Sequence, residues 1–226
     1  MNNHSIYANE ELKNWTERSG LLKQEQYFVE KYIRNEGILI EAGTGGGRIS
    51  LEVHDKYPNI KIVAFDFVEE MIKSAKLKSN EINFEVHDAS DLSIYDDNTF
   101  DAAIYLQQIV SLVPEEFISC VLKESYRVLK KDGIVIFSFL SYSGRKINPI
   151  VSFLVNIFRI LRKEKWQTQR LPWLKLSNKV NFKFFTKNQA TTYWFYEKEI
   201  IKILEDIGFT IVETKCDNMI YVVCKK

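Results

Sequence analysis

The chain has 226 residues, of which 46% are hydrophobic, and its formal net charge is +1 at pH 7. These values suit one large α/β domain and exclude a disordered or low-complexity chain. The N-terminus lacks the basic and then apolar profile of a signal peptide, and no run of ~18 apolar residues offers a membrane span. The three scattered cysteines, Cys120, Cys216 and Cys224, lack zinc or disulfide spacing, so we expect neither a zinc site nor a disulfide framework, and a cytoplasmic location.

The first third of the chain contains the start of a βαβ unit. Apolar residues recur at roughly helical spacing over residues 5–35, which predicts helices separated at Gly20. Residues 38–40 form a short apolar strand, which a glycine-rich loop follows. Apolar periodicity then resumes and predicts a helix that continues to about Tyr57.

The glycine-rich loop has the pattern acid-x-Gly-x-Gly-x-Gly, formed by Glu41, Gly43, Gly45 and Gly47. A dinucleotide-binding fingerprint would need glycine at position 48, where the chain has Arg48. Glycine lets such a loop turn sharply and lets its backbone approach a ligand closely. The N–H groups at the start of the following helix favour a negatively charged ligand group.

The remaining elements continue the α/β alternation. A strand over 60–65 ends at Asp66, about 20 residues beyond the loop, where a carboxylate can accept hydrogen bonds from two ribose hydroxyls. Two strands over 208–213 and 219–224 are close enough to pair as an antiparallel hairpin. The other predicted elements are helices over 68–79, 114–129 and 197–207 and strands over 82–86, 100–106 and 133–139.

The acidic glycine loop, Asp66, the segment 127–133 between a helix and a strand, and the C-terminal hairpin together resemble class I S-adenosylmethionine-dependent methyltransferases. The resemblance covers about residues 35–140 and 190–226. It implies an α/β, Rossmann-like, three-layer αβα fold with a seven-stranded, mostly parallel sheet whose last strand is antiparallel. It also implies methyl transfer from S-adenosylmethionine to N, O or C of a small-molecule acceptor. Amphiphilic and anionic small molecules are the first candidates for this acceptor. Residues 1–226 would form a single methyltransferase domain, with 1–35 as an N-terminal helical cap.

The resemblance also implies site residues. In that family the acid at the first strand end stands near the methionine amino group, and an Asp after the third strand meets the adenine amino group. The predicted cofactor-binding residues are Glu41, Ala42, Gly43, Thr44, Gly45, Gly47, Asp66, Phe67, Met71, Asp88, Ala89 and Leu106. Positional candidates for the acceptor side are Tyr7, Trp15, Arg18, Tyr105, Gln107 and Tyr142. No residue is predicted to be a general base or a metal ligand.

Residues 141–190 match no common pattern and are predicted to be a helical insert after the fifth strand. They carry eleven Lys or Arg side chains and a single acid, Glu164. A helix that starts near residue 148 is apolar except for one narrow polar stripe, so we expect it to be buried on most of its circumference. The stripe is formed by Ser152, Asn156, Arg159 and Lys163.

Three hypotheses remain open for this insert. It is a lid that closes over a small substrate and excludes water, or a basic amphipathic surface for anionic membranes or a lipid-like acceptor. The third is RNA binding, because aromatic residues between lysines can stack bases. Those aromatic residues are Trp166, Trp173, Phe182, Phe184 and Phe185.

Other functions stay as alternatives. The near-zero net charge, and the absence of a D/N-P-P-Y/F/W motif after the fourth strand, disfavour a nucleic-acid substrate. A non-catalytic interaction module would keep the cofactor fold without turnover. An NAD-dependent oxidoreductase is disfavoured by Arg48 and by the terminal hairpin. The sequence does not indicate an oligomeric state.

Overall fold

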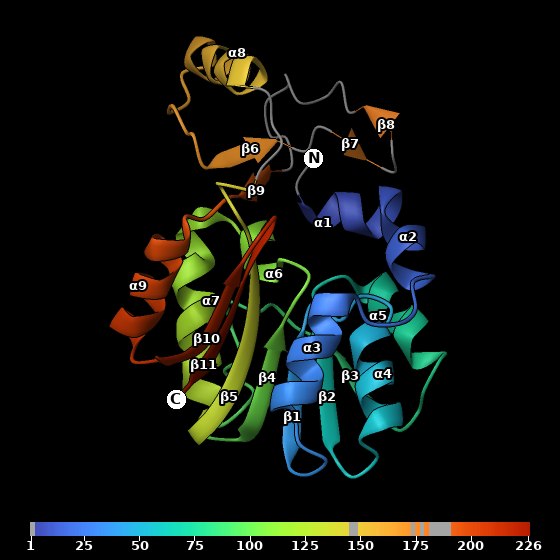
Figure 1. Cartoon of the computed structure of the whole chain (residues 1–226). Coiled ribbons are helices and arrows are strands. Elements are labelled where there is room, and N and C mark those ends of the chain that lie inside the picture. The colour runs from blue at the N-terminus through green and yellow to red at the C-terminus, as the bar shows by residue number, and fades with distance from the viewer. Residues whose placement is uncertain (1–2, 145–148, 173–174, 177–178, 181–190) are drawn as a thin grey trace.

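The computed structural model describes residues 3–144, 149–172, 175–176, 179–180 and 191–226. A seven-stranded sheet with helices on both faces makes up most of the molecule, and the insert lies at one end of it (Figure 1). Four of the aromatic residues considered for base stacking lie outside the described residues: Trp173, Phe182, Phe184 and Phe185.

The sheet has the strand order β10-β11-β5-β4-β1-β2-β3. Its neighbours from β5 to β3 pair in parallel, whereas β11 is antiparallel to both β5 and β10. The predicted Rossmann-like sheet with an antiparallel last strand is therefore confirmed. The strands are β1 (Ile38–Ala42), β2 (Lys61–Asp66), β3 (Asn83–Val86), β4 (Phe100–Tyr105), β5 (Leu129–Leu140), β10 (Thr210–Cys216) and β11 (Met219–Lys225).

The fifth strand begins earlier than predicted. β5 starts at Leu129 rather than Gly133, because Leu129 already pairs with Phe100. The ladder is then interrupted before Ala102 pairs with Ile134.

Two apolar layers hold the helices on the sheet. On one face Phe28, Val53 and Ile72 belong to a buried cluster with sheet residues such as Ile104. On the other face Leu122 and Leu204 pack in a cluster around Phe137. The helices of the first face are α3 (Lys23–Tyr32), α4 (Arg48–Lys56) and α5 (Glu69–Lys76), and those of the second are α7 (Glu115–Val128) and α9 (Glu197–Ile207).

Shorter elements lie at the carboxyl ends of the parallel strands. The predicted N-terminal helical region is divided into α1 (Asn3–Ser5), a π-helical turn η1 (Ile6–Glu10) and α2 (Leu12–Thr16). A short helix α6 (Ile109–Leu112) follows β4. The insert contains α8 (Pro149–Leu161), β6 (Arg170–Pro172), β7 (Lys175–Leu176) and β8 (Lys179–Val180), and β9 (Thr191–Tyr193) follows it directly. β6 pairs with β9 and β7 with β8, both antiparallel.

The predicted burial of α8 is wrong. Among the described side chains of this helix, Val155, Asn156 and Arg159 are buried, so two residues of its polar stripe face inward. Asn156 Oδ1 accepts a hydrogen bond from the Gln167 N–H at 2.9 Å, and Arg159 Nη1 donates to the Gln167 carbonyl at 2.9 Å. Asn156 and Arg159 are buried because they bind the chain that returns from the helix.

The apolar side of α8 consequently faces outward. Phe153 is 55% exposed, Leu154 42%, Ile160 53% and Leu161 73%. Within the described ranges, no helix is long and apolar enough to cross a membrane.

Candidate active site

A cavity of about 460 Å³ lies at the carboxyl ends of β1, β2 and β4. Open α/β sheets bind ligands outside the carboxyl ends of their strands, and this volume lies in the ~300–1,000 Å³ range of small-molecule sites. Its wall also includes residues from the N-terminal segment and from the insert. The predicted site residues that line it are Tyr7, Trp15, Gly43, Gly45, Asp66, Phe67, Met71, Asp88, Ala89 and Gln107.

The glycine loop closes tightly onto α6. Gly43 has a φ of +66°, and a Cβ at this position would lie 2.1 Å from Ile109 Cδ1. The next residue, Thr44, donates its N–H to the Phe65 carbonyl at 3.0 Å, which ties the loop to β2. A larger residue than glycine at position 43 would therefore displace the Ile109 side chain, α6 or the loop.

Asp66 ends β2 and is 7% exposed in the cavity wall. Its Oδ2 accepts the Gly45 N–H at 2.9 Å, and its Oδ1 accepts the Val68 N–H at 3.0 Å. Burial raises the pKa of Asp66, and the backbone N–H donors partly offset this effect. Each carboxylate oxygen has two lone pairs, so both oxygens retain capacity to accept from a diol.

Glu41 does not line the cavity, which corrects the expectation that it faces the ligand. Its carboxylate is 2% exposed, and Oε2 accepts hydrogen bonds from the hydroxyls of Thr44 (2.9 Å) and Ser50. Burial raises the pKa of Glu41 to about 7. Glu41 therefore connects the glycine loop to the first turns of α4.

Polar and aromatic groups line the cavity just beyond the ends of β2 and β3. Asp88 Oδ1 accepts the backbone N–H and the hydroxyl of Ser90 at 2.8 and 2.7 Å. Phe67 is 42% exposed, and its ring makes an edge contact with His4 at a centroid distance of 5.1 Å. Met71 is buried beside them. His4 was not predicted from the sequence.

A buried network orients Gln107 at the end of β4. Gln107 Nε2 donates to Glu25 Oε1, and Glu25 is paired with Arg48 through hydrogen bonds of 2.8 and 3.0 Å. Gln107 and Gln108 have φ angles of +57° and +60°, a conformation that is uncommon for residues with a side chain. Such strained positions cluster at functional sites. Arg48, which stands where a dinucleotide fingerprint has glycine, is thus part of this network.

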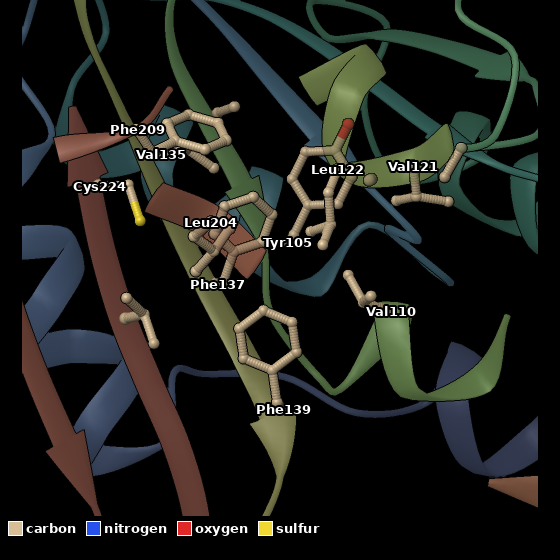
Figure 2. Packing of buried hydrophobic residues seen from close by; sticks show 14 of the residues in the cluster. Tyr105, Val110, Val121, Leu122, Val135, Phe137, Phe139, Leu204, Phe209 and Cys224 are labelled. Carbon is tan, nitrogen blue, oxygen red and sulfur yellow. The ribbon is translucent and has the colours of Figure 1, made fainter. Parts of the chain in front are cut away.

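Tyr105 lies in the core and not in the cavity, which corrects its place on the acceptor side. Figure 2 shows its ring among Val121, Leu122 and Phe137, and the side chain is 0% exposed. Burial raises the pKa of Tyr105. Because β4 is covered on both faces, the alternation of side chains could not show which residues reach the site.

The other predicted residues also lie outside the cavity wall. Tyr142 packs on Tyr196 at a centroid distance of 4.3 Å. Arg18 lies over the ring of Trp15, a wall residue, at 4.2 Å. Four more predicted residues do not line the cavity. Ala42, Thr44 and Gly47 lie in or beside the glycine loop, and Leu106 lies at the end of β4.

Several wall residues carried no recognisable sequence signal. Gln167 and Arg170 come from the insert, where Arg170 was one basic residue among eleven, and Thr191 follows the insert directly. Glu115 and Glu116 open α7, and their position could be read only as helix-starting acids. In the part of the chain that the structure describes, no group of three or more His, Cys, Asp or Glu side chains is placed to hold a metal ion.

Comparisons with known proteins agree with this geometry. Residues 39–133 match a family model described as a methyltransferase domain. The ubiquinone/menaquinone biosynthesis C-methyltransferase of Rickettsia akari is 34% identical over 116 residues, which are 47% of this chain and 45% of the relative. The chain thus matches about half the length of that relative.

Solved structures share the fold at low sequence identity. A SAM-dependent methyltransferase from Methanosarcina mazei has a TM-score of 0.69 and 19% identity over 88% of this chain and 96% of its own. The 1,6-didemethyltoxoflavin-N1-methyltransferase of Burkholderia thailandensis has a TM-score of 0.56 and 16% identity over 84% and 71%. Residues 39–133 of this chain therefore match a methyltransferase domain, and the chain shares its fold with solved methyltransferase structures.

Proposed function

We propose that the protein transfers a methyl group from S-adenosylmethionine to N, O or C of a small-molecule acceptor. The observation that carries this proposal is the buried Asp66 carboxylate, which is bound to the Gly45 N–H in the cavity wall. The Rickettsia relative, a C-methyltransferase, and the Burkholderia structure, an N-methyltransferase with bound S-adenosylhomocysteine, support a small acceptor.

The residues of the cavity fit this cofactor. Asp66 has acceptor capacity for the ribose hydroxyls, and Gly43 and Gly45 leave the loop backbone accessible. Phe67 and Met71 offer an apolar surface to the adenine, and Asp88 offers a carboxylate to its amino group. When bound, the cofactor supplies a methyl group activated by positive sulfur.

Alignment is the main task left to the protein, because the sulfonium already activates the methyl group. Gln107 is a neutral amide held by Glu25, so it can orient an acceptor but cannot act as a general base. We therefore assign no catalytic residue, and we propose that the reaction proceeds by direct attack of the acceptor on the methyl carbon.

We also propose that the chain is one domain with a cap and a lid. Tyr7 and Trp15 from residues 1–35, and Gln167 and Arg170 from residues 141–190, line the same cavity as Asp66. Their joint wall would exclude water from the reacting atoms. A cytoplasmic location fits Cys120, Cys216 and Cys224, which are all free.

The outward face of α8 supports contact with an anionic membrane surface. Its exposed apolar side chains include Phe153, Leu154 and Leu161, and residues 141–190 carry ten more basic than acidic side chains. Apolar area and positive charge together are what an interfacial helix needs to bind anionic lipids.

Calorimetric titration with S-adenosylmethionine, S-adenosylhomocysteine and NAD tests the cofactor assignment. We expect saturable binding of the first two, weakened at least about tenfold in Asp66→Asn, which loses a charged acceptor of hydrogen bonds. The control Asp206→Asn changes an exposed aspartate on α9 and should bind like the wild type. Binding of NAD alone would favour an oxidoreductase, and binding of none of the three would favour a non-catalytic module.

A further inference from the structure

Arg170 has an unusual environment at the insert side of the cavity. It lies on β6 and is 9% exposed. Its Nη1 donates to Thr191 Oγ1 at 3.1 Å, and its Nη2 donates to the Val113 carbonyl at 2.8 Å. The buried Nε–H has no hydrogen-bond acceptor among the described residues.

The charge of Arg170 also has no carboxylate within ion-pair distance among the described residues. Arg48, which is buried to a similar extent, forms an ion pair with Glu25, whereas Arg170 forms none within the described residues. The acids that influence it, Glu115 and Glu116, line the same cavity but lie beyond ion-pair distance. A guanidinium stays protonated even where burial disfavours its charge. Buried charges are normally paired with an opposite charge, whereas the Arg170 guanidinium lies over the Tyr193 ring at 5.4 Å and has no carboxylate partner in the part of the chain that the structure describes.

A second polar atom without a partner lies in the same wall. Asn3 Nδ2 donates to the carbonyls of Leu112 and Thr191, which fixes the orientation of the amide. Its Oδ1 is buried and accepts no hydrogen bond from any described residue. Asn3 and Arg170 are both bound to Thr191, one to its carbonyl and the other to its hydroxyl. The unsatisfied acceptor and the unsatisfied cationic donor therefore belong to two side chains that bind the same residue.

We infer that this end of the cavity binds an oxyanion, a carboxylate or a phosphate ester, of the methyl acceptor next to an O–H or N–H group of the same molecule. Arg170 would bind the oxyanion through its Nε–H, and Asn3 Oδ1 would accept the neighbouring hydrogen. This inference rests on the proposed function and narrows the substrate class to small anionic molecules that also carry a hydrogen-bond donor.

The test is calorimetry on protein saturated with S-adenosylhomocysteine. The probes are 3-hydroxybenzoate, benzoate, 3-hydroxybenzamide and phenyl phosphate. We expect 3-hydroxybenzoate to bind more tightly than benzoate and more tightly than the neutral amide. Phenyl phosphate, compared with benzoate, shows which oxyanion the site prefers.

Three variants assign the effect to residues. Arg170→Met should weaken the binding of benzoate and of 3-hydroxybenzoate at least about tenfold, which is the effect expected from the loss of a charge-assisted hydrogen bond. Arg170→Lys keeps the charge and should restore part of that affinity. In Asn3→Ala, 3-hydroxybenzoate should bind no more tightly than benzoate. Arg34→Met, which changes an exposed arginine, should match the wild type.

Two results would overturn the inference. One is equal affinity for the anions in wild type and Arg170→Met, and the other is binding of S-adenosylhomocysteine without binding of any anion. Failure to bind S-adenosylhomocysteine would instead overturn the proposed function. Circular dichroism and thermal melting of each variant separate a loss of binding from a loss of folding.

Discussion

Two carboxylates at the ends of neighbouring strands have different surroundings. Asp66 accepts from backbone N–H groups in the cavity wall, whereas Glu41 accepts from two hydroxyls behind the glycine loop. Burial raises the pKa of both side chains, and for Glu41 it does so to about 7. The sequence pattern identifies both acids, but it cannot distinguish the one that faces a ligand from the one that holds the loop.

The raised pKa of Glu41 predicts a pH-dependent stability. Between the ordinary pKa of 4.5 and about 7, the folded protein holds a proton that the unfolded chain has released. The contribution of Glu41 to the free energy of unfolding therefore falls by about 2 to 3 kcal/mol as the pH rises through this window. Urea unfolding from pH 5 to pH 8 should show this fall in the wild type and a smaller fall in Glu41→Gln.

Any constant effect of the substitution cancels, because only the change with pH is compared. Parallel curves for wild type and Glu41→Gln over this range would contradict the assignment. Asp206→Asn on α9 serves as the control, and its curve should parallel that of the wild type.

We expect a substitution at Gly43 to cause a steric clash that a second substitution, at Ile109, relieves. In Gly43→Ala the new Cβ would lie 2.1 Å from Ile109 Cδ1, at a φ of +66°. We expect a loss of about 2 to 4 kcal/mol in the free energy of unfolding, from strain and overpacking together. In an Ile109→Ala background the same change should cost at least about 1 kcal/mol less, measured by a double-mutant cycle in urea.

Gly20 offers the matched control for backbone strain. It has a φ of +73°, but a Cβ added there would meet no described atom within 4 Å, so Gly20→Ala tests strain without a clash. Equal costs at positions 20 and 43 would show that the contact with Ile109 contributes nothing.

At the scale of elements, an ion pair joins α3 to α4 beneath the site. Glu25 and Arg48 are 0% and 7% exposed, and Glu25 also accepts the Leu22 N–H at the start of α3. Arg48→Met would leave a buried carboxylate without its cation, which costs about 3 to 5 kcal/mol. Urea unfolding should show this loss, and Glu25→Gln in the same background should recover part of it.

The exposed pair of Lys13 and Glu17 is the matched control. Its nitrogen and oxygen are 3.8 Å apart and both side chains are well exposed, so Lys13→Met should change stability by less than about 1 kcal/mol. A similarly small effect of Arg48→Met would contradict the role given to the buried pair.

Much of the fold could be predicted because each sheet element carries a local signal. Apolar runs and turn residues mark β1, β2 and β4, and Pro114 with two acids marks the start of α7. The orientation of α8 could not be predicted, because periodicity identifies a stripe but not what covers it. There the amide of Asn156 and the guanidinium of Arg159 satisfy a backbone segment, and that requirement outweighs apolar burial.

The candidate site likewise contains residues that the sequence could predict and residues that it could not. Gly43, Asp66 and Asp88 belong to one motif with fixed spacing, and the structure places all three in the cavity wall. Arg170 and Asn3 reach that wall from segments far apart in the chain, so no local pattern relates them. The positions of these two residues depend on how segments that are far apart in the chain pack together, and a local sequence pattern does not show such contacts.

At the scale of the whole molecule, the outward face of α8 predicts binding to anionic vesicles. We expect co-sedimentation with vesicles that contain phosphatidylserine, weaker binding at high salt, and little binding to phosphatidylcholine alone. Phe153→Ser combined with Leu161→Ser should reduce the bound fraction several-fold, because both side chains are more than half exposed.

Leu77→Ser provides the control, since Leu77 is 89% exposed at the end of α5, outside the insert. Equal losses for Leu77→Ser and for the α8 variant would show that the effect is not specific to the insert. Salt-independent binding would contradict a contribution from the basic residues.

The place of Asn3 also decides how this protein should be tethered. Asn3 binds Thr191 in the wall of the cavity, so a fusion partner or an immobilising surface attached just before it would be held beside the ligand. Lys226 instead exchanges backbone hydrogen bonds with Asp132 and Gly133 at the opposite end of the sheet (Figure 1). Attachment through the C-terminus therefore leaves the cavity accessible to probes in any binding measurement.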